Sequence, residues 1–124
     1  MAKTDTGLIE KIALPSSIGR HFGKQIWGVD WVLYKWIKYV EQRVMDAIAD
    51  ESNERYIIVN APPQTGKSSW VGLLLPFWFT GMFPHKRVMY ISYSDDFSVA
   101  RGKDVKALHE RFGRELFGTS IDPN

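Results

Sequence analysis

The sequence of 124 residues contains no cysteine, which excludes disulfides, thiolate catalysis and zinc–thiolate sites. Its three histidines, His21, His85 and His109, are scattered and lack metal-ligand spacing. Sixteen basic against fourteen acidic side chains leave a net charge of +2, too small to indicate a nucleic-acid or membrane surface. No apolar run approaches the ~20 residues that span a bilayer, and the N-terminus does not resemble a signal peptide. These absences predict a cytosolic protein.

What the chain does contain is an ordinary globular composition with an unusual aromatic content of 14%, including five tryptophans. Residues 1–24 are mixed and interrupted by helix breakers, so we expect a loosely structured lead-in segment before one domain at 25–124. Asp30 is a candidate N-cap for an amphipathic helix that extends to about Asp50. Trp31 and Trp36 lie at its start and in its apolar stripe, which favours core packing for both.

Two apolar runs are typical of buried parallel strands, Tyr56–Val59 and Val88–Tyr93. Between them, a helix is expected from about Lys67 to Phe79, bent or ended early by Pro76 and capped by Gly81. A third helix is expected to begin at Ser94-Asp95-Asp96, to pack through five apolar residues and to end at Gly113; the five are Phe97, Ala100, Val105, Leu108 and Phe112. This order predicts an α/β fold of the three-layer P-loop NTPase type around a parallel sheet. We expect this sheet to be incomplete, because no later strand is recognisable in the sequence.

The residues Ala61-Pro62-Pro63-Gln64-Thr65-Gly66-Lys67-Ser68 match a phosphate-binding loop, or Walker A motif, with alanine at the first glycine position. Backbone N–H groups at a helix N-terminus cradle phosphates, and the cradle would comprise Gln64, Thr65, Gly66, Lys67, Ser68 and Ser69. Lys67 would neutralise phosphate charge and Ser68 would bind Mg²⁺. The chain departs from the motif at Ala61, Pro62 and Pro63. Prolines lack an N–H group, but these positions precede the stretch 64–69, so its phosphate-binding N–H donors are all retained. The motif predicts ATP and Mg²⁺ as ligands.

The loop, the following Pro76-Phe77-Trp78 and the run Arg87–Asp96 with its Ser-Tyr-Ser-Asp-Asp end resemble the large terminase subunits of tailed bacteriophages. Phe112-Gly113 and Leu116-Phe117-Gly118 fit the same pattern, so the likeness covers roughly residues 31–118. The resemblance implies the ATPase portion of a viral DNA-packaging motor, with double-stranded DNA, the portal, the small terminase subunit and the rest of the terminase as partners. It also implies a homo-oligomer in the host cytoplasm, associated with the procapsid and not with a membrane.

The resemblance also exposes gaps. Family members often carry an arginine in this loop, where this chain has Pro63 and Gln64, so that role would pass to another arginine. Arg101, Arg111 and Arg114 follow the second run and are candidates, although solvated helix arginines are commoner. We assign Asp95 and Asp96 to helix capping and not to the magnesium-binding acidic pair of an ATPase. No catalytic residue beyond Lys67 and no nuclease site is recognisable, so we expect nucleotide binding without hydrolysis.

Weaker assignments and alternatives remain open at this stage. Gln25 precedes the loop where motor ATPases often place an adenine contact. The basic strip of Arg101, Lys103 and Lys106 is balanced by nearby acids, and His109 is expected at the surface. A small P-loop kinase and a non-hydrolysing nucleotide- or partner-binding fragment are the competing functions, and a truncated frame, a split gene or an expressed piece would explain the short ATPase.

Overall fold

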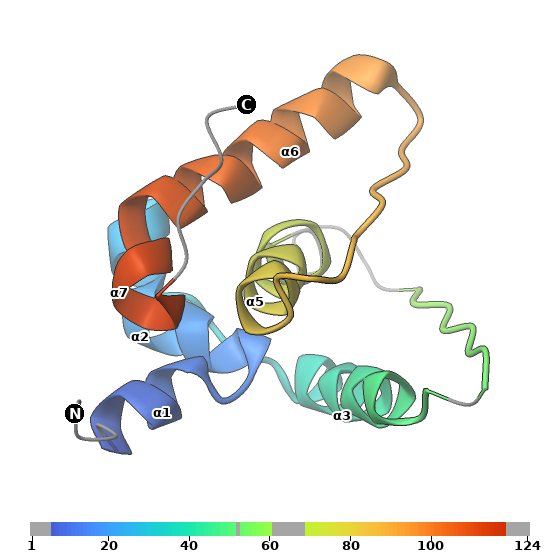
Figure 1. Cartoon of the computed structure of the whole chain (residues 1–124), viewed down its shortest axis with the longest axis horizontal. Helices are drawn as coiled ribbons and strands as arrows, with labels where there is room; N and C mark the ends of the chain where they lie inside the picture. The colour runs from blue at the N-terminus through green and yellow to red at the C-terminus, as the bar shows by residue number, and fades with distance from the viewer. Residues whose placement is uncertain (1–5, 52, 61–68, 119–124) are drawn as a thin grey trace.

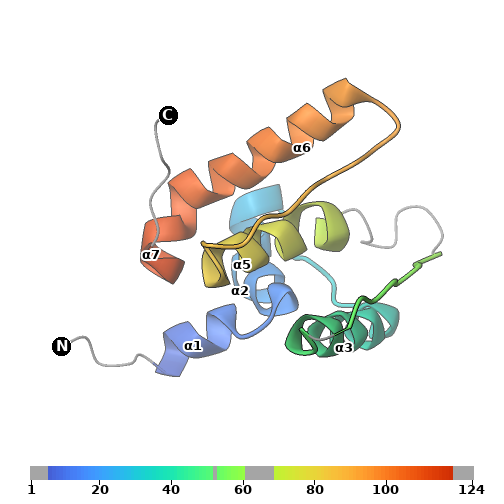
Figure 2. The same ribbon diagram turned by 45° about the vertical axis from the view of Figure 1, so that its right-hand side comes forward.

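The computed structural model describes residues 6–51, 53–60 and 69–118, and these ranges form a helical assembly. The helices preceding the loop are α1 (Thr6–Ile12), α2 (Pro15–Trp27) and α3 (Lys35–Ala49). After it come a π-helical turn η1 (Trp70–Leu74), α5 (Leu75–Met82), α6 (Asp95–Leu108), a second π-helical turn η2 (His109–Gly113) and α7 (Arg114–Phe117). Figures 1 and 2 place α5 at the centre, with α2 and α6 packed around it and α3 below.

The predicted α/β fold with its parallel sheet is wrong, because the described residues form helices and none of them forms a strand. The two predicted strands, Tyr56–Val59 and Val88–Tyr93, are extended but form no ladder with any described part of the chain. β-branched and aromatic residues favour the extended conformation, whereas a strand also needs a neighbour within hydrogen-bonding distance. Here residues 53–60 run beside α3 while residues 87–93 pass α5, and the two segments lie apart (Figures 1 and 2).

The segment predicted as a loose lead-in contains α1 and most of α2, and the expected boundary between residues 24 and 25 falls inside α2. Pro15 occupies the first turn of α2, where its fixed φ and missing N–H favour a helix start. Gly19 is one of the residues that predicted a break in this segment, but it lies within α2. Its missing side chain leaves room for the Trp31 ring, because a Cβ at Gly19 would lie 2.6 Å from Trp31 Cε3. Trp31 is thus packed against α2 as expected, although it precedes α3, which begins later than Asp30 predicts.

The helix after the loop changes geometry next to Pro76, as the sequence predicts. Leu75 N–H bonds to the carbonyl of Trp70, one residue farther back than in an α-helix. A proline ring collides with the carbonyl four residues earlier, and a wider turn relieves that collision. Gly81 is not the predicted cap; α5 ends at Met82 and Gly81 packs against the ring of Phe117.

The third helix begins as predicted, because the Ser94 hydroxyl accepts a hydrogen bond of 3.1 Å from Phe97 N–H. It does not end at Gly113: helical structure continues through η2 and α7 to Gly118, which adopts a left-handed φ of 68°. Of its predicted inner face, Leu108 and Phe112 are buried, whereas Ala100 is exposed. The core joins these helices through aromatic and aliphatic side chains, namely Ile18, Phe22, Ile37, Trp70, Leu73, Leu74, Phe77, Trp78, Leu108, Phe112 and Leu116.

Candidate functional site

The predicted phosphate-binding residues Gln64, Thr65, Gly66, Lys67 and Ser68 lie outside the described residues, which resume at Ser69. Their roles therefore stay predictions, and the geometry that bears on them is that of the two flanks. Upstream, residues 53–60 are extended. Downstream, Ser69 is half-buried and has helical dihedral angles, φ −65° and ψ −43°, directly before η1. The segment between them therefore joins an extended stretch to a helix.

The first residue of η1 is locked to the core by a buried carboxylate. Glu41 on α3 is 3% exposed, and its Oε2 accepts a hydrogen bond of 2.9 Å from the Trp70 indole N–H. The same oxygen accepts 2.8 Å from Ser16 N–H, while Oε1 accepts 2.7 Å from the Ser16 hydroxyl. One side chain thus ties α2, α3 and the start of the helix after the loop together. Any ligand held at 61–68 would adjoin a fixed helix turn.

Sequence reasoning missed Glu41, because a glutamate in an amphipathic helix is normally assigned to the solvated face. The signal was nevertheless present. Glu41 follows the buried Ile37 by one helical turn, and Val44 and Ile48 continue the same stripe. A carboxylate at a helical spacing inside an apolar stripe predicts a buried polar group, which needs hydrogen-bond partners.

The other side of η1 faces the second extended segment and α6. A Cβ added at Gly72 would lie 3.7 Å from the Tyr90 hydroxyl and 3.8 Å from Arg101 Nε. Arg101 also lies over the Phe97 ring at 5.1 Å and contacts Asp104 Oδ2 at 3.4 Å. Of the three arginines singled out from sequence, Arg101 is therefore the one beside the helix that follows the loop.

Gln25 occupies the last turns of α2. Its side chain is exposed, and its backbone carbonyl accepts a hydrogen bond of 2.8 Å from Arg111 Nη1. Arg111 also lies 4.8 Å from the centre of the Phe112 ring. Arg111 is thus committed to holding the end of α2, while an adenine contact by Gln25 stays a prediction.

His109 is not the surface residue expected from sequence. Its Nε2 lies 2.7 Å from the Thr80 hydroxyl, and its ring meets Phe77 edge-on at 4.6 Å between centroids. Burial among apolar neighbours lowers the pKa of His109 below its ordinary value, because the charged form loses hydration. The histidine therefore joins α5 to η2 as a packed, hydrogen-bonded group.

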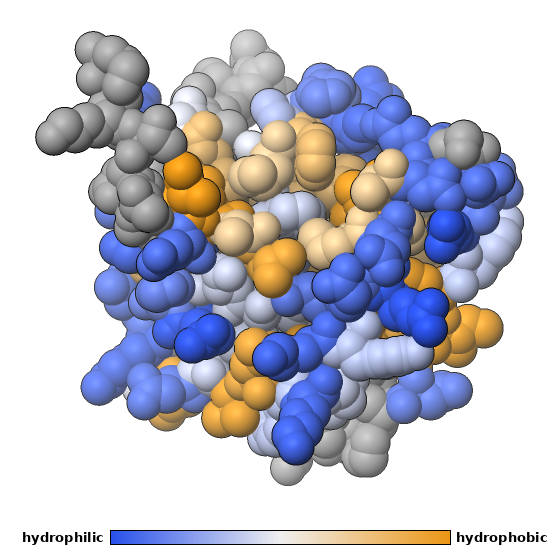
Figure 3. All heavy atoms as spheres, turned by 90° about the horizontal axis from the view of Figure 1, so that it is seen from below, coloured by the Kyte–Doolittle hydropathy of each residue, from blue (hydrophilic) through white to orange (hydrophobic). Residues whose placement is uncertain are grey.

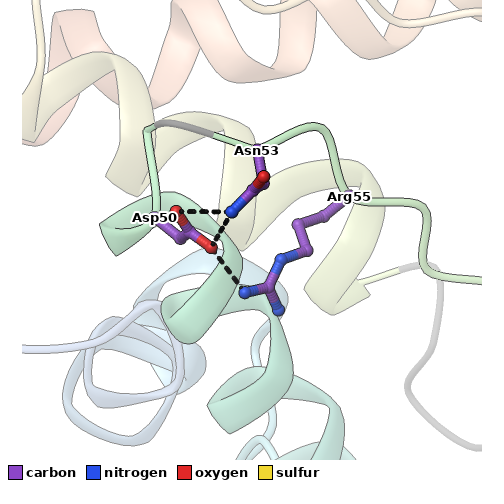
Figure 4. A network of polar contacts seen from close by, with 3 residues as sticks. All are labelled: Asp50, Asn53 and Arg55. Atoms are coloured by element: carbon purple, nitrogen blue, oxygen red, sulfur yellow. Dashed lines mark hydrogen bonds and ion pairs between the residues drawn. The ribbon is translucent and has the colours of Figure 1, made fainter.

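A groove of about 1050 Å³ lies between α3 and residues 55–60, immediately before the loop. Its α3 wall carries Lys35, Trp36, Tyr39 and Arg43, and Arg43 donates a hydrogen bond of 2.9 Å to the Tyr39 hydroxyl. The course of the opposite wall is set by a polar network at the end of α3 (Figure 4), whose members are Asp50, Asn53 and Arg55. The shortest contact in it joins Arg55 Nη2 and Asp50 Oδ2 at 2.6 Å.

Asp95 and Asp96 occupy the exposed first turn of α6, but neither is the predicted cap, because the cap is the Ser94 hydroxyl. The described residues contain no cluster of three or more histidine or acidic side chains able to hold a metal ion. Within the same part of the chain, no helix is long and apolar enough to cross a membrane. Comparison with protein-family models, curated proteins and solved structures finds no match to this chain.

Proposed function

We propose that this chain binds Mg²⁺–ATP through residues 61–68 and serves as the nucleotide-gripping part of a DNA-packaging motor. The observation that carries the proposal is the run Gly66-Lys67-Ser68 placed directly before a helix that has begun by Ser69. Helix N-termini carry unpaired N–H groups and the positive end of a dipole, the two features that a polyphosphate requires. The proposal concerns this segment and its helix and involves no sheet.

The donor set fits the ligand. Backbone N–H groups, an ammonium from Lys67 and a hydroxyl from Ser68 match the charge and the oxygen chemistry of a Mg²⁺–triphosphate. When bound, the metal ion would neutralise phosphate charge. The chain's own contribution is to position these groups, and the anchoring of Trp70 by Glu41 supports that contribution, because it immobilises the helix turn that the phosphates would contact.

Arg101 adds a second supporting feature. Its guanidinium borders η1 about one helical turn beyond the loop, and the family resemblance leaves open which arginine replaces the one missing at Pro63 and Gln64. A guanidinium at this place would raise the local positive potential for an anion. Its contact with Asp104 is half-exposed and weak, so Arg101 remains available to a ligand of higher charge.

The larger role rests on the terminase resemblance alone. In that role, the chain would act in the host cytoplasm at the procapsid, together with double-stranded DNA, the portal, the small subunit and the remaining terminase. We propose gripping without hydrolysis for these 124 residues, since no acidic pair for Mg²⁺ and no water-orienting residue is recognisable in the sequence.

The test compares Mg²⁺–ATP binding by the full chain and by Lys67→Ala, using isothermal titration calorimetry. We expect the variant to bind at least about tenfold more weakly, because a charge-assisted contact contributes about 1.5–3 kcal/mol. Lys103→Ala is the matched control: it removes the same charge from an exposed position on α6 and should leave binding unchanged. Equal affinities for the chain and Lys67→Ala would refute the assignment of the loop.

A further inference from the structure

Residues Arg87–Tyr93 form an extended segment whose outer side chains are apolar and uncovered. Met89, Ile91 and Tyr93 are 83%, 80% and 89% exposed, whereas Tyr90 between them is half-buried. The first half of the segment, residues 87–90, borders a hollow between α3 and α5, and Ile91 lies beyond it, largely open to solvent. Within the described residues this segment belongs to no β-ladder. An extended, apolar and unpaired segment is a template for another strand.

The charges at the two ends of the segment indicate which strand it fits. Lys86 and Arg87 precede it, and Asp95 and Asp96 follow it. Two copies running antiparallel with Ile91 opposite Ile91 would bring Arg87 of each copy close to Asp95 in the exposed first turn of the other copy's α6, whereas Lys86 pairs with Glu51 of its own copy at 3.2 Å. In the same register, Met89 meets Tyr93 on the uncovered side. A parallel pair would instead bring like charges together, which is destabilising.

We propose that a second copy of this chain covers this segment, forming a two-fold antiparallel ribbon centred on Ile91. The contact is isologous, so it closes at two copies and does not propagate. The proposal goes beyond nucleotide binding and does not depend on it.

The size of the contact sets its strength. Edge-to-edge pairing covers only the flanks of Met89, Ile91 and Tyr93, which touch their cross-strand neighbours on one face of the ribbon. A standard stable interface buries about 800 Å² per partner. The ribbon is therefore a dimer that dissociates on dilution. Salt should weaken it as well, because the end pairs are exposed ion pairs.

Residues 53–60 are the competing template, since Tyr56 and Ile58 are each 86% exposed. Their flanking charges do not favour self-pairing: Glu54 and Arg55 lie at one end, and the other end is the neutral Asn60. Pairing of this segment with residues 87–93 of another copy would be heterologous and would generate open chains of molecules. The two arrangements therefore differ in stoichiometry.

The absence of cysteine makes a direct test possible, because any single introduced cysteine is unique. In the proposed register Ile91 faces its own copy, with Cβ atoms about 4.5–5.5 Å apart, and a small shift of the two backbones brings them to the roughly 3.5–4.5 Å of a disulfide. We expect Ile91→Cys to give a covalent dimer under mild oxidation. Met89→Cys, which faces Tyr93, should give several-fold less, and Ile58→Cys, a control of similar exposure, should give little. Equal yields from Ile91→Cys and Met89→Cys would indicate parallel pairing and overturn the proposal.

Sedimentation velocity over a concentration series provides the second measurement. We expect a reversible monomer–dimer equilibrium for the unmodified chain. Ile91→Lys should raise the dissociation constant at least about tenfold, because it removes apolar contact and opposes two like charges. Ile58→Lys should leave that constant unchanged, and circular dichroism checks that both variants stay folded. A chain that stays monomeric at all concentrations, or open-ended oligomers that Ile58→Lys abolishes, would overturn the two-fold ribbon.

Discussion

Replacing Glu41 by leucine should destabilise the protein far more than replacing it by glutamine. Leucine removes the acceptor of three hydrogen bonds, from Ser16 N–H, the Ser16 hydroxyl and the Trp70 indole. Each buried donor left without a partner costs about 1–3 kcal/mol. Part of the sum is recovered because leucine is apolar and Ser16 lies in the first turn of α2, so we expect a net loss of about 3 kcal/mol.

Glutamine can satisfy the same donors. Its oxygen, placed where Oε2 lies, accepts from Ser16 N–H and the Trp70 indole, while its NH₂ donates to the Ser16 hydroxyl, which rotates to accept. The substitution also keeps the size of the side chain and leaves no buried donor without an acceptor. We expect Glu41→Gln to change the free energy of unfolding by less than about 1 kcal/mol.

Urea unfolding followed by circular dichroism measures both variants. At m-values of about 1–3 kcal/mol/M, the leucine variant should lower the midpoint by roughly 1–3 M. Glu10→Leu on α1 is the control, because this glutamate is exposed and its loss should stay within about 0.5 kcal/mol. A glutamine variant as unstable as the leucine variant would refute the reasoning, since it would show that the negative charge matters and the hydrogen-bond geometry does not. Coupling between Glu41→Leu and Trp70→Phe should reach about 1 kcal/mol.

Two further predictions concern packing and pH. Gly19→Ala should destabilise by about 1–3 kcal/mol, because its Cβ would lie 2.6 Å from the Trp31 ring, whereas Gly102→Ala, with nothing within 4 Å, should stabilise α6 by about 0.4–1 kcal/mol; equal melting temperatures would contradict both. Because the pKa of His109 is lowered in the folded protein, the unfolded chain takes up this proton first as the pH falls. The stability that neutral His109 contributes is therefore fully present above the ordinary pKa of histidine and is lost as the pH falls below that value. The melting temperature should therefore fall less between pH 7.5 and pH 5 (assay conditions) in His109→Gln than in the parent chain, and identical slopes would contradict the assignment.

Local signals in the sequence were interpreted correctly where one residue determines the outcome. The Ser94 cap, the disturbance at Pro76 and the amphipathic stripe of α3 all depend on side chains within one or two turns. The extended conformation of residues 53–60 and 87–93 also follows from β-branched and aromatic composition. These features need no information about distant parts of the chain.

The errors concern contacts between distant residues. A sheet was inferred from two extended runs, but pairing requires that the intervening helix bring them together, and η1 and α5 instead pack against α2. Gly19, counted as a breaker in the lead-in, instead leaves room for Trp31 to pack against α2, and Gly23, which the sequence did not single out, does the same. His109 was assigned to solvent and Glu41 was not singled out, yet both are held by hydrogen bonds to residues at least 25 positions away.

The two proposals can be separated because they rest on different segments with different anchors. The proposed nucleotide binding rests on Lys67 and on the helix turn that Glu41 holds through Trp70. Self-association depends on Ile91 and on the charged residues that flank its segment. Lys67→Ala should leave the dimer intact, and Ile91→Lys should leave ATP binding intact, since neither side chain contributes to the other contact. Failure of one proposal therefore carries no information against the other, whereas loss of stability at Glu41 would affect both through the shared core.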